Sequence, residues 1–78
     1  MQTIRITDAA YDGDYRLWLT FNDGRKGLVD FEHYIHRKPF EPLHDRAIFQ
    51  NFQLNGWTIS WLDGSLDIAP ESLYAQLT

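Results

Sequence analysis

Three histidines are the residues of this sequence with the clearest potential for chemistry. His33 and His36 lie three positions apart, Asp30 and Glu32 stand beside them, and His44 follows eight residues later. On a helix, residues three apart share a face, so two imidazoles could reach one metal ion. A zinc site needs three or four ligands, and the others would have to come from distant segments. We therefore interpret these histidines as surface or half-buried residues and expect no metal and no other cofactor.

Aspartates gather at two places, Asp8, Asp12 and Asp14 near one end of the sequence and Asp63 and Asp67 near the other. General acid–base catalysis needs two carboxyl groups aimed into one cleft with shifted pKa values. These aspartates instead fall mostly at predicted turns, where the side chain bonds nearby backbone N–H groups. Asp67 is the exception, because it falls inside a predicted strand, where Asp is depleted. We expect it at an exposed edge or bonded to the start of the last helix.

Nucleophiles in an activating context are missing from the sequence. There is no cysteine, and Ser60, Ser65 and Ser72 lie outside any Gly-x-Ser-x-Gly pattern. No glycine-rich loop follows a predicted strand to hold a phosphate group. We therefore predict that the protein is not an enzyme.

Trp18 is the aromatic residue most informative about binding. In the alternating stretch 15–21 it points away from the four apolar residues of that stretch and lies beside Arg16. Exposed Trp and Arg are enriched at interaction hot spots. Trp18 and Arg16 are therefore candidate interaction residues, together with the basic pair Arg37 and Lys38. The alternative, that the strand is covered on both faces and Trp18 belongs to the core, stays open at this point.

The charge balance restricts the class of partner. Seven Lys and Arg against eleven Asp and Glu give a formal net charge of −4. Nucleic-acid binders concentrate positive charge, so direct nucleic-acid binding is disfavoured, whereas a basic protein partner would suit an acidic chain. The longest apolar run has three residues, far fewer than the roughly 20 of a membrane span or the 7–15 of a signal-peptide core. We predict a cytoplasmic protein with no membrane segment.

Four Asx-Gly pairs predict the hairpin turns that must position these residues: Asp12-Gly13, Asp23-Gly24, Asn55-Gly56 and Asp63-Gly64. Strand-like stretches lie between them: Ile4 with Ile6, 15–21, 27–31, Phe52 with Leu54, 57–61, and Leu66 with Ile68. They predict two antiparallel β-meanders of about three strands each. Open meanders leave strand edges, so self-association to a homo-oligomer is a further expectation.

Three short helices complete the expected fold. Asp30 would cap a turn over 30–36, and Asp45 would cap a helix within 43–49 that ends at Asn51. Pro70 suits the first position of a helix over 70–77, on which Leu73 and Leu77 would face the sheet together. The prediction is thus a small α+β domain over residues 1–78, with about six strands, two or three short helices, and a core supplied by twelve aromatic residues.

The stretch 61–74 reads Trp-Leu-Asp-Gly-Ser-Leu-Asp-Ile-Ala-Pro-Glu-Ser-Leu-Tyr and resembles the small bacterial family catalogued as domain of unknown function 2442 (DUF2442). Upstream segments 17–24, 29–31, 40–43 and 48–49 agree in the same order. The motif residues read well as structure, forming a turn, a helix start and docking contacts: Trp61, Asp63, Gly64, Asp67, Pro70, Leu73 and Tyr74.

The resemblance implies a compact α+β domain and no established activity. Members look like partners of small neighbouring proteins in toxin–antitoxin pairs, and some carry a helix-turn-helix domain after this module. We therefore expect a non-enzymatic protein-interaction module, the antitoxin-like partner of a small bacterial toxin. One alternative is a small ligand-binding or hydrolytic protein using a His/carboxylate site. Another is a DNA-associated regulator module lacking its helix-turn-helix extension, which the end of the sequence at Thr78 puts in doubt.

Overall fold

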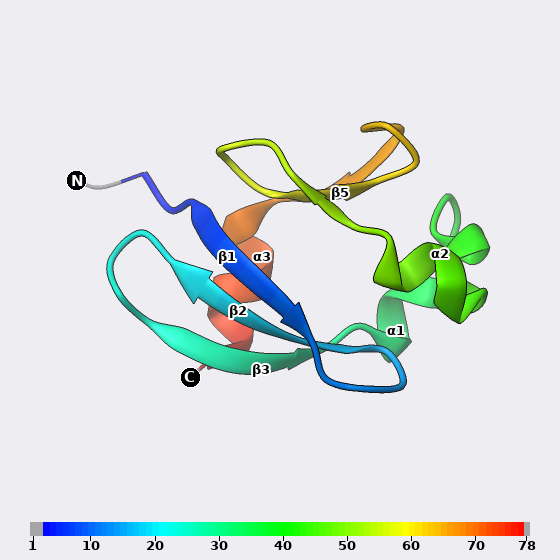
Figure 1. The fold of residues 1–78 in the computed structure, drawn as a ribbon, viewed down its shortest axis with the longest axis horizontal. Helices are drawn as coiled ribbons and strands as arrows, with labels where there is room; N and C mark the ends of the chain where they lie inside the picture. The colour runs from blue at the N-terminus through cyan, green and yellow to red at the C-terminus, as the bar shows by residue number, and fades with distance from the viewer. Residues whose placement is uncertain (1–2, 78) are drawn as a thin grey trace.

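Two Asp-Gly turns fold the first part of the chain into one antiparallel sheet, called sheet A here. In the computed structural model, which describes residues 3–77, sheet A has the order β1-β2-β3 (Figure 1). Its strands are β1 (Ile6–Tyr11), β2 (Arg16–Phe21) and β3 (Lys26–Asp30). Gly13 and Gly24 adopt φ angles of 102° and 91°, which glycine reaches without steric cost.

The start of the first strand differs from the prediction. Ile4 lies outside β1, and the strand continues instead to Tyr11. The reason is the hydrogen bonding of the preceding backbone, because the N–H of Arg5 donates to the side-chain oxygen of Asn22. The N–H of Ile6 donates to the carbonyl of Trp57 at 2.9 Å, which ties sheet A to the second sheet.

The second sheet, sheet B, has the order β4-β5-β6 and consists of very short strands. They are β4 (Gln53–Leu54), β5 (Ile59–Trp61) and β6 (Leu66–Ile68). Predicted strand residues Phe52 and Trp57 fall outside it. The side chain of Asn55 explains the late start of β5, because its oxygen accepts from the N–H groups of both Trp57 and Thr58.

The helices are single turns that side chains and prolines delimit. They are α1 (Glu32–Ile35), η1 (Glu41–His44), α2 (Arg46–Gln50), α3 (Pro70–Tyr74) and η2 (Ala75–Leu77). Asp45 caps α2 as predicted, accepting from Ala47 N–H at 2.9 Å, and its extended backbone separates α2 from η1. The cap position of α1 is Phe31 rather than Asp30, although the Asp30 carboxylate accepts from the Glu32 N–H. The two antiparallel sheets and these short helices confirm the predicted α+β class.

One hydrophobic core fills the space between the two sheets and the helices. On β2, Leu17, Leu19 and Phe21 are buried and point into it. Three rings form its centre, with the Phe31 ring centroid 5.5 Å from that of Phe49 and 5.8 Å from that of Trp61. The indole N–H of Trp61 donates to the carbonyl of Phe49 at 2.8 Å. Aromatic residues supply much of this core, as their number predicted.

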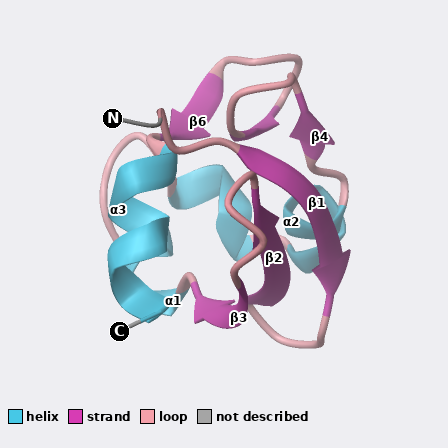
Figure 2. Ribbon diagram, turned by 90° about the vertical axis from the view of Figure 1, so that its left-hand side faces the viewer, coloured by secondary structure: helices cyan, strands magenta, loops and turns pink. Residues whose placement is uncertain are grey.

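The C-terminal helical segment covers the inner face of sheet A (Figures 1 and 2). Leu73 is fully buried, and Leu77 packs where Gly27 of β3 leaves room for it. The hydroxyl of Tyr74 donates to the carboxylate of Asp23 in the β2–β3 turn, 51 residues away in sequence. Leu73 and Leu77 therefore both face the sheet, as predicted, while the opposite face of sheet A carries no such helix.

Candidate binding surface

The outer face of sheet A presents its side chains in three rows. The strand pairing places Asp8, Thr20 and Lys26 in the first row and Ala10, Trp18 and Leu28 in the second. Arg16 and Asp30 pair in the third, where Asp12 continues β1 by donating its N–H to the carbonyl of Arg16. We call these nine residues the open face. Apolar side chains thus occupy the middle row, and charged side chains flank it.

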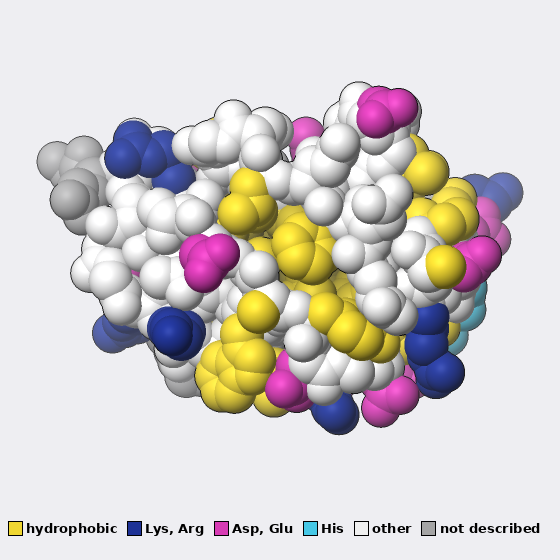
Figure 3. Space-filling model, viewed as in Figure 1, with side chains coloured by type: hydrophobic (Ala, Val, Ile, Leu, Met, Phe, Trp, Pro, Cys, Tyr) yellow, Lys and Arg dark blue, Asp and Glu magenta, His cyan; other side chains and the backbone are white. Residues whose placement is uncertain are grey.

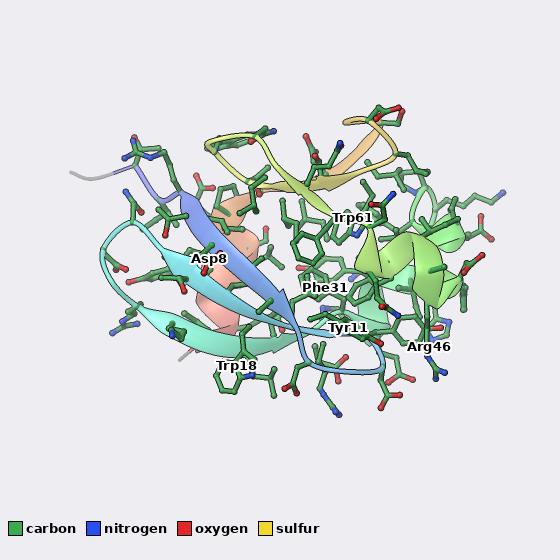
Figure 4. All side chains as sticks on the ribbon, viewed as in Figure 1. Asp8, Tyr11, Trp18, Phe31, Arg46 and Trp61 are labelled. Atoms are coloured by element: carbon green, nitrogen blue, oxygen red, sulfur yellow. The ribbon has the colours of Figure 1, made fainter. Side chains whose placement is uncertain are left out.

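Trp18 lies on the surface, which decides between the two interpretations of its position. Its side chain is 42% exposed, whereas its strand neighbours Leu17 and Leu19 are fully buried. Figure 4 labels the exposed Trp18 ring, whose indole N–H donates to the carboxylate of Asp12 on the hairpin at 3.1 Å. Leu28, the cross-strand neighbour of Trp18, is 40% exposed.

A hollow of about 380 Å³ lies in the open face. Its lining comes from the first two rows: Asp8, Ala10, Trp18, Thr20 and Lys26. The small side chain of Ala10 leaves the space, and the ring of Trp18 borders it. Figure 3 shows apolar side chains where Figure 4 labels Trp18, with an acidic side chain at the position of Asp8. An apolar knob with a charged neighbour would fit such a hollow.

An acidic cluster, which we call the acidic margin, borders one end of the open face. It consists of the carboxylates of Asp12, Asp14, Asp30 and Glu32. Arg16 lies 3.5 Å from Asp12 and 3.9 Å from Asp14, and Arg46 lies 3.4 Å from Asp14. The four carboxylates and the guanidinium groups of Arg16 and Arg46 together carry a formal charge of 2 − 4 = −2.

Arg37 and Lys38, the other two candidate interaction residues, lie away from this surface. They belong to the segment between α1 and η1 and are both exposed. The guanidinium of Arg37 lies 5.9 Å from the ring centroid of Tyr34. The structure therefore brings Trp18 and Arg16 together on the open face and leaves this basic pair outside it.

The histidine rings make other contacts than the spacing of His33 and His36 suggests. Helix α1 ends at Ile35, so His36 leaves the helix, and its ring meets that of His44 with centroids 5.0 Å apart. The ring of His33 instead lies against Tyr34. Within residues 3–77, no group of three or more His, Cys, Asp or Glu side chains is arranged to hold a metal ion.

Most of the chain matches a known family model. That model, described as a protein of unknown function (DUF2442), covers residues 6–78, from the first residue of β1 onward. The chain belongs to this family. No curated protein and no solved structure matches the chain. Within residues 3–77, none of the helices has the length and apolar character needed to cross a membrane.

The DUF2442 motif residues build the second sheet and the docked helix. Asp63 and Gly64 form the turn between β5 and β6, with φ angles of 56° and 87°, and Leu62 before them also has a positive φ of 53°. Pro70 begins α3, and Asp67 is exposed on β6, an edge strand of sheet B. The exposed-edge alternative for Asp67 is therefore the correct one.

Tyr74 is the motif residue whose contact changes acid–base behaviour. Its hydroxyl donates a hydrogen bond to Asp23, which lowers the pKa of the Asp23 carboxyl below its ordinary value. The same bond raises the pKa of the Tyr74 hydroxyl. Tyr74 is half-buried against the core and Asp23 is exposed, and their hydrogen bond fastens α3 to the β2–β3 turn.

Sequence reasoning named only Trp18 and Arg16 as interaction residues, so it missed the other seven residues of the open face. A signal for three of them was present, because Lys26, Leu28 and Asp30 alternate with Gly27 and Val29 in the way Trp18 alternates with Leu17 and Leu19. The register that joins the three strands into rows came only from the structure.

Proposed function

We propose that this DUF2442 protein is a non-enzymatic protein-interaction module that binds its partner through the open face. The supporting observation is the 42% exposure of Trp18 on a sheet face whose opposite side carries the core. A large exposed aromatic inside a polar rim is the usual anatomy of an interaction site. Leu28 extends the apolar surface beside Trp18, and the bond to Asp12 limits the conformational freedom that the indole would lose on binding.

The acidic margin suggests the chemistry of the partner. Its net charge of −2 adjoins the open face, so a basic protein surface would be attracted to it and oriented by it. In the toxin–antitoxin pairs that the family resemblance suggests, this chain would be the antitoxin-like half, and its partner a basic toxin. We propose that the pair acts in the cytoplasm, because disulfides are rare there and this chain has no cysteine with which to form one.

Co-expression with the product of the adjacent gene tests the proposal. The tagged chain should capture that product and relieve its toxicity, and Trp18→Ala should weaken capture at least tenfold because it removes the central apolar contact. Trp57→Ala is the matched control, since Trp57 is also 42% exposed but lies outside the open face. Equal loss in both variants, or undiminished capture by Trp18→Ala, would contradict the assignment of the surface.

The role of the acidic margin is tested by association kinetics. Glu32→Gln should lower the association rate severalfold at low salt and have less effect at high salt, because charge steering is screened. Glu71→Gln, which removes an exposed carboxylate from α3, is the control of equal charge change. If both variants slow association equally, total charge and not the margin governs the encounter.

A further inference from the structure

We infer that the open face binds a second copy of this chain when the basic partner is absent, an inference that rests on the proposed function because both use this surface, so the dimer and the complex with the partner exclude each other. Sheets that stack face to face keep their strands within about 30° of each other. A two-fold axis parallel to β2 then lays β1 of one copy over β3 of the other. Each row of the open face then meets the same row of the second copy, and the β1 residue of that row faces the β3 residue of the other copy.

Charge complementarity in the first row supports this pairing. Reversal of the row places Asp8 of each copy opposite Lys26 of the other and gives two equivalent ion pairs. Asp8 and Lys26 are separated by β2, so about 10 Å divides their strands. Both are exposed, and among residues 3–77 neither takes part in an ion pair. Their charges are therefore available to another molecule.

Shape complementarity in the second row supports the same arrangement. Reversal places Leu28, which is 40% exposed, opposite Ala10, where the hollow of about 380 Å³ lies. The leucine acts as a knob and the hollow beside Ala10 as its hole, twice per dimer. The Trp18 rings of the two copies meet near the axis, where aromatic side chains prefer offset or edge-to-face contact.

The third row and the size of the surface limit the strength of the dimer. Asp12, Arg16 and Asp30 give this row a net charge of −1, so the two copies repel each other at that end, and the acidic margins stay side by side. A stable interface buries roughly 800 Å² on each partner, whereas three strands about 4.8 Å apart and three rows about 7 Å apart cover only about 300 Å². We therefore expect a weak dimer that forms between about 10 µM and 1 mM.

A charge-swap experiment tests the inference directly. Sedimentation equilibrium of the wild-type chain should show concentration-dependent dimers over that range, and Asp8→Lys and Lys26→Asp should each weaken association at least tenfold. An equimolar mixture of the two variants should recover it, because the mixed pair again joins opposite charges in both contacts. Far-UV circular dichroism of each variant checks that the fold is unchanged.

Two results would overturn the inference: a wild-type chain that stays monomeric to about 1 mM, or a mixture that associates no better than either variant alone. The proposed function has a separate readout in the capture experiment with Trp18→Ala. A monomeric chain that still captures the neighbouring product through Trp18 refutes only the second copy. A monomeric chain with no Trp18-dependent capture refutes both.

Discussion

Replacing Trp61 by phenylalanine tests whether this family-motif residue is structural, as its contacts indicate. The indole is fully buried and its N–H donates to the carbonyl of Phe49 at 2.8 Å. The substitution leaves that carbonyl unpaired, at a cost of about 1–3 kcal/mol. It also opens a cavity where the outer, six-membered ring of the indole was, which adds about 1–2 kcal/mol. The free energy of unfolding should therefore fall by about 2–5 kcal/mol.

That loss is close to the whole stability of a domain of this size, about 3–5 kcal/mol. With a urea dependence of about 1 kcal/mol per M, the unfolding midpoint followed by far-UV circular dichroism should fall by about 2 M or more. Trp57→Phe is the control, because Trp57 is 42% exposed and should lose less than about 0.5 kcal/mol. If the two variants unfold at the same urea concentration, Trp61 does not hold the core together.

Three other substitutions probe the turns and caps that shape the fold. Tyr74→Phe removes the hydrogen bond that lowers the pKa of the Asp23 carboxyl. The stability from this bond is fully present above the pKa that Asp23 has in the unfolded chain, and it is lost as the pH falls through the lower pKa of the folded protein. Urea midpoints of this variant and the wild type should therefore differ near neutral pH and converge in acid; a constant gap would refute the linkage. Asp45→Ala should destabilise α2 by about 1 kcal/mol in the same assay, because the cap on Ala47 is lost, whereas Asp45→Asn should be nearly neutral. Gly64→Ala should cost about 1 kcal/mol because φ is 87° there, and an unchanged melting temperature would show that the turn relaxes.

Local chemistry was enough to predict the turns, the cap of α2 and the fold class. Asp12-Gly13 and Asp63-Gly64 turn the chain because of their own backbone preferences, and Asp45 caps α2 through a bond to a residue two positions on. Such features depend on a few neighbouring residues, so they are visible in a sequence. The short α1 shows the limit, because its cap position is Phe31, one residue after the predicted Asp30.

The binding surface could be predicted only in part. The alternation of apolar and polar residues along a strand shows that the two faces of the sheet differ, but it does not show whether the second face is also covered. Trp18 was compatible with both outcomes until α3 was seen on the opposite face. The ring contact between His36 and His44 could not be predicted either, because the segment between them contains two prolines and has no regular hydrophobic pattern. Rows such as Asp8–Thr20–Lys26 depend on a register set by long-range pairing.

The attachment of α3 to the β2–β3 hairpin has a consequence for how the chain is made. Tyr74 reaches Asp23 across 51 residues, and Leu77 fills the space above Gly27. A growing chain on the ribosome therefore holds the hairpin long before the segment that covers its inner face has been synthesised. Until residues 70–77 emerge, the part of the apolar side of β2 that they cover is exposed to other nascent chains and to chaperones. Folding is consequently a late event. In nascent chains stalled on the ribosome at different lengths, protease resistance should begin only after Leu77 has left the exit tunnel.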